Sequence, residues 1–82
     1  MNSVSETITK ILVDKLAIAE TEVTEDANFI KDLGIDSLDY AELVLEFEQA
    51  FDIQIPDSDA EKLQTISQAI TYIQEKLATK QQ

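Results

Sequence analysis

The side chains of this sequence leave few kinds of chemistry open. Histidine and cysteine are both absent from its 82 residues, which removes the commonest general base, the commonest zinc ligand and the thiolate nucleophile. Among the remaining hydroxyls, Ser37 stands out because Asp36 and Asp39 mark the expected start of a helix around it. A helix start offers free backbone amides and the positive end of the helix dipole to an anionic group on that hydroxyl.

Ser37 also has plainer interpretations. A serine in the first turn of a helix commonly has only a structural role. The acidic surroundings are compatible with a phosphorylation site, although nothing else in the sequence supports one. Position alone therefore leaves the role of Ser37 open.

The charge of the chain limits its partners. Six Lys and Arg residues against 17 Asp and Glu residues give a net charge of −11, and the isoelectric point is near 4.1. Such a surface repels nucleic acids and anionic lipids, so we expect no nucleic-acid binding and no membrane insertion. It attracts proteins with basic patches, although acidity could equally serve solubility alone. No segment has the pattern of a targeting or membrane-spanning sequence, and we expect a cytoplasmic protein.

Helical periodicity dominates the chain. The spacing of apolar residues predicts helices over 3–17, 37–51, 57–63 and 65–79, with a long connection over 18–35. One glycine and one proline make a turn-rich β fold untenable. We therefore expect a single all-α domain over 1–82, a small four-helix bundle with a long first loop and a short third helix. Three pairs have the spacing of a capping box, namely Ser3 with Glu6, Ser58 with Glu61 and Thr65 with Gln68.

The second predicted helix has two apolar faces. A bundle helix needs only one buried face, so the second must either lie under the long connection or remain exposed as a binding surface. Both interpretations are open at this point. The broad face consists of Tyr40, Leu43, Val44, Phe47 and Phe51, and the narrow one of Leu38, Ala41 and Leu45.

The sequence around Ser37 resembles the attachment motif of acyl carrier proteins. The motif is Asp36-Ser37-Leu38-Asp39, with DLGI before it and Glu42-Leu43 after it, inside the run FIKDLGIDSLDYAELVLEFEQAF. The segment from Ile55 to Lys62 is similar to the short third helix of that family. The likeness covers nearly the whole chain and is weakest before Val23.

The resemblance implies a specific chemistry. In this family the serine hydroxyl, here Ser37, is joined by a phosphodiester to 4′-phosphopantetheine, which a phosphopantetheinyl transferase donates from coenzyme A. The thiol at the end of this arm carries an acyl group as a thioester. A protein of this kind needs neither a catalytic base nor a metal, so we expect a carrier and not an enzyme.

The resemblance also implies a docking surface and a cavity. The second helix is expected to contact basic, partly apolar patches on acyl-processing enzymes, while the protein itself stays a monomer. The residues predicted to face partners are Asp36, Leu38, Asp39, Ala41, Glu42, Leu45 and Glu48. Those predicted to line an acyl cavity are Phe29, Val44, Phe47, Leu63 and Ile73.

Some residues depart from the pattern of many fatty-acid carriers. Tyr40-Ala41 stands where Thr-Val is common, Phe47 replaces a leucine and Ala50 replaces an acid. These changes leave a dedicated polyketide or other specialised carrier open beside a fatty-acid carrier. An unmodified helical adaptor would keep the exposed strip without needing Ser37. A calcium-binding module would need a twelve-residue acidic loop with a central glycine, which the sequence lacks.

Overall fold

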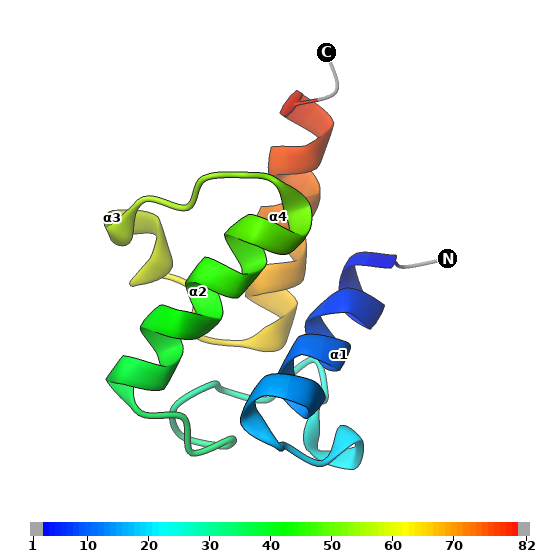
Figure 1. Cartoon of the computed structure of the whole chain (residues 1–82), viewed down its shortest axis with the longest axis vertical. Coiled ribbons are helices and arrows are strands. Elements are labelled where there is room, and N and C mark those ends of the chain that lie inside the picture. The colour runs from blue at the N-terminus through cyan, green and yellow to red at the C-terminus, as the bar shows by residue number, and fades with distance from the viewer. Residues whose placement is uncertain (1–2, 81–82) are drawn as a thin grey trace.

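Helices make up nearly all the regular structure of residues 3–80, the part of the chain that the computed structural model describes. Within these residues the regular strands of a sheet are missing, and one isolated bridge pairs Asn28 with Thr65. The all-α, four-helix prediction is confirmed (Figure 1). The elements are α1 (Ser3–Leu16), the 3-10 turn η1 (Glu20–Glu22), α2 (Ser37–Phe51), α3 (Asp57–Ala60) and α4 (Ile66–Lys80).

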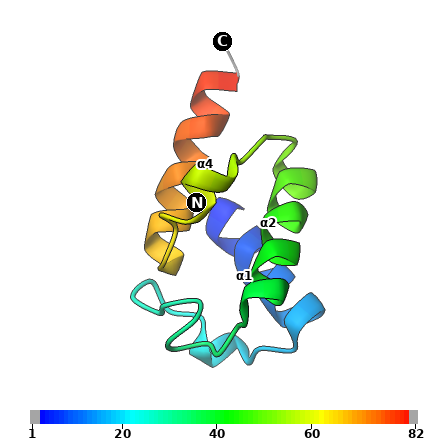
Figure 2. The ribbon, with the colours of Figure 1, turned by 90° about the vertical axis from the view of Figure 1, so that its left-hand side faces the viewer.

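The long helices α1, α2 and α4 surround one apolar core (Figure 2). Helix α1 contacts both α2 and α4, so it joins the other two long helices. Burying one large apolar side chain is worth roughly 1.5–3 kcal/mol, which makes these contacts the main source of stability. The largest fully buried side chains are Ile8, Leu12, Phe29, Leu43, Phe47 and Ile73. None of the described helices combines the length and apolar character needed to cross a membrane.

The connection between α1 and α2 is fixed to the segment that precedes α4. The Phe29 amide donates to the Gln64 carbonyl at 2.9 Å, and the Ile66 amide donates to the Ala27 carbonyl at 3.0 Å. Phe29 is itself fully buried, so the loop adds a side chain to the core. Gly34 has a φ of 70° just before α2, a left-handed conformation that glycine adopts without strain. The loop therefore runs along the base of the bundle (Figure 1).

Two of the predicted helix starts are confirmed. The Asp36 carboxylate accepts a hydrogen bond from the Asp39 amide at 2.8 Å, which caps α2. The Thr65 hydroxyl accepts from the Gln68 amide at 3.2 Å, and the Gln68 side chain accepts from the Thr65 amide at 3.2 Å. The predicted pair of Ser3 and Glu6 is not described, because the Ser3 side chain lies outside the described side chains.

The third helix is shorter than predicted, and its predicted capping box is wrong. Helix α3 ends at Ala60 and has Pro56 as its N-cap, with no side-chain cap, so Ser58 lies inside the first turn instead of before it. The fixed φ of proline suits a helix start, and the N-cap lies at Pro56, two residues before the Ser58 that the capping-box spacing indicates. The chain then continues in turns, with the Leu63 amide donating to the Ala60 carbonyl at 3.2 Å.

Two tyrosines attach this short helix to the bundle. The Tyr40 hydroxyl on α2 donates to the carbonyls of Ala60 and Leu63 at 2.8 and 2.7 Å. The Tyr72 hydroxyl on α4 donates to the Asp59 carboxylate at 2.6 Å. A helix of four residues has no independent stability in water, so α3 depends on such contacts.

Ionisation of these tyrosines predicts a loss of stability in alkali. Burial raises the pKa of Tyr40 from 10.0 to about 12. Burial, followed by the hydrogen bond and the charge of Asp59, raises the pKa of Tyr72 from 10.0 to about 12. The unfolded chain therefore loses these protons at lower pH than the folded chain. The stabilisation is complete below pH 10 and is lost as pH rises through 12.

Urea unfolding measured from neutral pH to pH 12 tests this expectation. The wild type should lose stability steeply above pH 10, whereas the double variant Tyr40→Phe, Tyr72→Phe should show a shallower decline. The double variant also controls for lysine deprotonation, which both proteins share. Equally steep declines would show that the two phenols do not cause the loss.

Candidate functional site

The narrow apolar strip of α2 is exposed. Leu38 is 78% exposed and Leu45 is 56% exposed, and Ala41 is also exposed. The interpretation in which the long connection covers this strip is wrong, because that connection is bonded to the segment before α4. The buried face of the same helix consists of Leu43, Val44 and Phe47.

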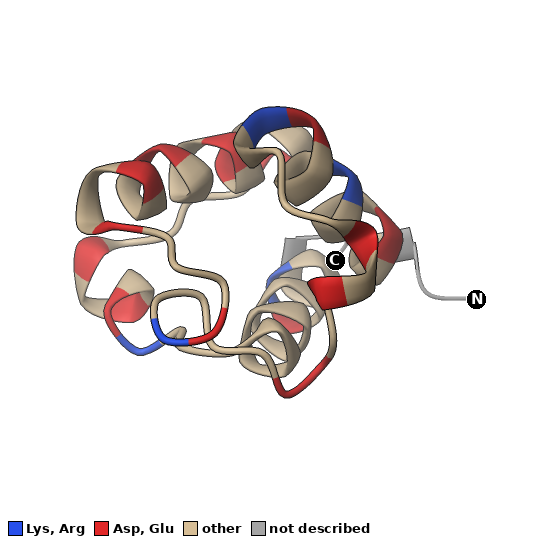
Figure 3. Ribbon diagram, turned by 90° about the horizontal axis from the view of Figure 1, so that it is seen from below, with Lys and Arg blue, Asp and Glu red and all other residues tan. Residues whose placement is uncertain are grey.

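Acidic side chains surround this strip. Asp36, Asp39 and Glu42 are exposed, and acidic residues recur along the helices while basic residues are few (Figure 3). An apolar centre with a charged rim is typical of a protein-docking surface, where the centre supplies affinity and the rim steers the approach. The described residues contain no group of three or more acids arranged to hold a metal ion.

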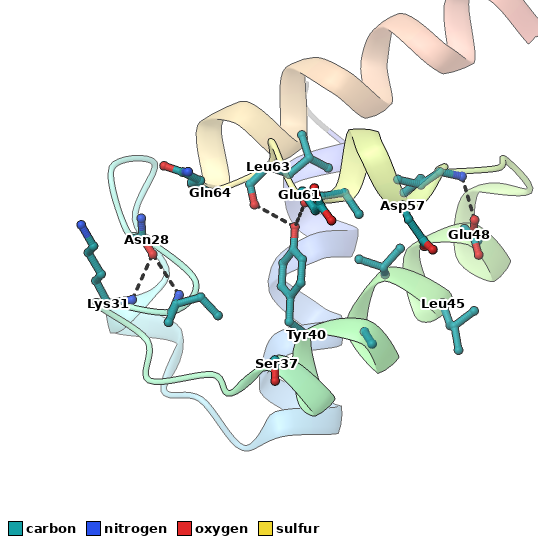
Figure 4. Close-up of a pocket in the computed structure, with 15 residues that line it drawn as sticks. Asn28, Lys31, Ser37, Tyr40, Leu45, Glu48, Asp57, Glu61, Leu63 and Gln64 are labelled. Carbon is teal, nitrogen blue, oxygen red and sulfur yellow. Dashed lines mark hydrogen bonds between the residues drawn. The ribbon is translucent and has the colours of Figure 1, made fainter.

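A groove of about 750 Å³ lies beside the strip, between α2 and the segment that contains α3 (Figure 4). Ser37 is exposed and lines one part of it. Lys31 is the one cation among the described residues that line the groove. Residues of α2 in the lining are Ser37, Tyr40, Ala41, Val44, Leu45 and Glu48, and the facing residues include Ile55, Asp57, Ala60, Glu61 and Leu63.

Tyr40 spans this groove from α2 to the end of α3. Its ring is half-buried and lies against Phe29, with 5.6 Å between ring centroids and an interplanar angle of 54°. The two carbonyls at its hydroxyl share a single phenolic hydrogen. The sequence predicted that Tyr40 adds bulk toward the core. It did not predict the polar contact, because this contact joins residues 20 and 23 positions apart.

Glu48 differs from the other residues predicted to face partners. Its carboxylate accepts a hydrogen bond from the Ile55 amide at 2.7 Å, and its side chain is half-buried. Glu48 therefore holds the connection between α2 and α3, a role that the sequence did not indicate. The other six predicted partner residues are exposed.

The structure does not bring the predicted cavity residues together around one space. Val44 and Leu63 line the groove. Phe29, Phe47 and Ile73 are fully buried in the core and do not belong to the groove lining. Helical periodicity identifies inward-facing residues, but a tightly packed core position and a cavity wall have the same periodicity.

Comparisons with known proteins identify the family. A family model described as the phosphopantetheine attachment site matches residues 6–73. The chain is 49% identical over 80 residues to the acyl carrier protein of Amoebophilus asiaticus, covering 98% of this chain and 100% of that one. It is 51% identical over 73 residues to the acyl carrier protein of Akkermansia muciniphila, covering 89% and 91%. This chain belongs to the acyl carrier protein family.

Membership of this family establishes the role and the cofactor. The protein is a carrier that holds acyl groups as thioesters on covalently attached 4′-phosphopantetheine. The arm supplies a terminal thiol, which explains how a chain without cysteine takes part in thioester chemistry. The exposed strip and the groove are the features of this structure that such a role would use.

The bond between Glu48 and Ile55 can be tested by substitution. Glu48→Ala should lower the free energy of unfolding by about 1–2 kcal/mol, because the buried Ile55 amide loses its acceptor. Glu48→Gln should have a smaller effect, since its amide oxygen can accept the same bond. Urea denaturation measures both.

Glu42→Ala is the matched control, because Glu42 is an exposed glutamate on the same helix. We expect it to change stability by less than about 0.5 kcal/mol. Equal losses for the Glu42 and Glu48 variants would mean that the contact with Ile55 contributes nothing to stability.

Proposed function

We propose that Ser37 carries the phosphopantetheine arm. The observation that supports this assignment best is its placement as the exposed first residue of α2, on the edge of the groove. A modifying enzyme needs an accessible hydroxyl, and Ser37 meets that requirement. The resemblance of the sequence around Ser37 to the attachment motif of acyl carrier proteins supports the same assignment.

The start of α2 suits a phosphodiester. The Asp36 carboxylate already binds the Asp39 amide, whereas the amides of Ser37 and Leu38 precede any intrahelical acceptor. These amides and the helix dipole favour a negative charge on the Ser37 oxygen. Repulsion from Asp36 and Asp39 opposes it, but all three side chains are exposed and solvent screens the repulsion.

The exposed strip of α2 is the proposed docking surface. Leu38, Ala41 and Leu45 would supply apolar contact beside the arm, and the acids around them would guide partners with basic patches. The expected partners are the phosphopantetheinyl transferase and the enzymes that load, modify and unload the acyl group. Glu48 contributes charge to this surface while its carboxylate remains bonded to Ile55.

The groove is the proposed resting place of the acyl chain. Val44, Leu45 and Leu63 offer apolar surface within reach of a group attached at Ser37. Burying a methylene is worth about 0.8 kcal/mol, so partial shelter of a chain remains reversible. We propose fatty-acid or related acyl assembly as the pathway, acting as a cytoplasmic monomer without catalytic activity of its own.

A specialised pathway is the second candidate. Tyr40 fills part of the groove and is bonded across it, a bulkier arrangement than the threonine of many fatty-acid carriers would make. A carrier dedicated to particular acyl intermediates would accommodate such a change. Mass spectrometry of the acylated protein from its own cells distinguishes the two pathways.

The assignment of Ser37 predicts a single site of modification. Coexpression with a phosphopantetheinyl transferase should add one arm to the wild type and none to Ser37→Ala, as measured by intact mass. Ser58→Ala is the control, because Ser58 is also exposed and lies in the first turn of α3. Loading of the Ser37 variant would refute the assignment, and a wild type that stays unmodified would favour the adaptor interpretation.

The docking surface predicts a charge-dependent rate. Glu42→Lys should slow arm transfer on the order of tenfold at low salt, because it places a cation beside the strip. Glu75→Lys makes the same charge change at an exposed site on α4 and should leave the rate nearly unchanged. Transfer kinetics across a salt series measure the effect, and thermal unfolding confirms that both variants are folded. Equal slowing in the two variants would attribute the effect to net charge alone.

A further inference from the structure

Tyr40 crosses the groove beside α2 and reaches its opposite wall. Lys31 lies on one side of its ring, Leu45 and Glu48 lie on the other, and Ser37 lies near the base of its side chain on the same helix (Figure 4). The hydroxyl reaches the Ala60 and Leu63 carbonyls on the opposite wall. The ring therefore occupies space between α2 and the α3 segment, three residues along the helix from the proposed attachment site.

The core directly behind this ring is closed. Phe29, against which the Tyr40 ring lies, is fully buried. Phe47 and Leu43 on α2 are also fully buried. Ser37 and Tyr40 are three residues apart, so they project from neighbouring positions on the same helix. A chain attached at Ser37 that turned inward between α2 and α3 would meet Tyr40 first.

We propose that Tyr40 excludes the acyl chain from the interior and confines it to the outer groove over Ala41, Val44 and Leu45. This inference rests on the proposed attachment at Ser37. It makes Tyr40 a residue that determines how much of its cargo this carrier can shelter. The favoured cargo is a short acyl group, or one whose chain stays accessible to partner enzymes.

The contacts of Tyr40 make the interior less favourable than the outer groove as a place for the acyl chain. To admit a chain, the ring must leave Phe29, and the hydroxyl must release two carbonyls at the end of α3. The phenol would lose both acceptors, and the Leu63 carbonyl would lose its phenolic donor next to an apolar chain, which is unfavourable. The Ala60 carbonyl would keep the bond from the Leu63 amide. A chain in the outer groove gains apolar contact with Val44 and Leu45 without any of these losses. The outer position is therefore the more favourable one for short chains.

Thermal unfolding of a series of loaded forms tests the proposal. A phosphopantetheinyl transferase loads the wild type, Tyr40→Phe and Tyr40→Thr from acyl coenzyme A with chains of four, eight and twelve carbons. The midpoint of the wild type should change little with chain length. That of Tyr40→Thr should rise with length by about 5 °C or more, because added methylenes become buried.

Tyr40→Phe separates the hydroxyl from the ring. It keeps the aromatic volume and removes the bonds to Ala60 and Leu63, so its midpoint should rise with chain length less than that of Tyr40→Thr. Each variant is compared with its own form that carries the arm without an acyl chain. This comparison removes any difference in intrinsic stability between the variants. If Tyr40→Thr does not fold, a rise in Tyr40→Phe that is absent from the wild type carries the same conclusion.

Methyl NMR spectra locate the chain directly. In the wild type, twelve-carbon cargo should shift the methyl signals of Val44 and Leu45 and leave those of the buried Leu43 and Ile73 unchanged. In Tyr40→Thr the Leu43 and Ile73 signals should shift as well. The proposed role of Tyr40 would be refuted by two results in the loaded wild type. The methyl signals of Leu43 and Ile73 would shift, and the thermal unfolding midpoint would rise with chain length as in Tyr40→Thr. Intact mass distinguishes this failure from failure of the Ser37 assignment, in which Ser37→Ala is loaded too.

Discussion

Burial of Leu43, Val44 and Phe47 fixes the rotation of α2 about its own axis, and the functional surface depends on that rotation. With these three side chains in the core, the helical repeat turns Leu38 and Leu45 toward solvent. The same rotation leaves Ser37 exposed at the helix start. The loop before α2 cannot cover this face, because its backbone is bonded to the segment before α4. The packing of the core thus determines which residues of α2 form the exposed strip.

The opposite wall of the groove is held in a different way. Helix α3 has four residues, none of them fully buried, and polar side chains fix its position. Tyr40 reaches it from α2, Tyr72 reaches it from α4, and Glu48 holds the connection that leads to it. Ile55 and Leu63, which flank α3, are buried in the core, so apolar packing anchors both ends of this wall and the hydrogen bonds hold α3 between them.

The sequence predicted those features that depend on local spacing. Apolar periodicity predicted α1, α2 and α4, and cap chemistry predicted the start of α2 at Asp36 and of α4 at Thr65. It did not predict the contacts of Tyr40 or Glu48, because a polar bond between distant residues has no local pattern. The start of α3 at residue 57 agrees with the prediction, but its cap and its end do not, because Pro56 and not Ser58 is the N-cap and the helix ends at Ala60. The cavity residues could not be separated from the core for a related reason, since both face inward.

The acidic rim of α2 affects how the exposed apolar strip meets other molecules. Leu38 and Leu45 form an exposed apolar strip that could associate with the strip of a second copy. The net charge of −11 opposes this contact, because two copies repel one another across their acidic rims. A partner with a basic patch experiences attraction from the same rim. We propose that the acids around α2 select among partners by charge sign before the apolar strip makes contact. In this proposal one charge distribution keeps the carrier monomeric and directs it to its enzymes.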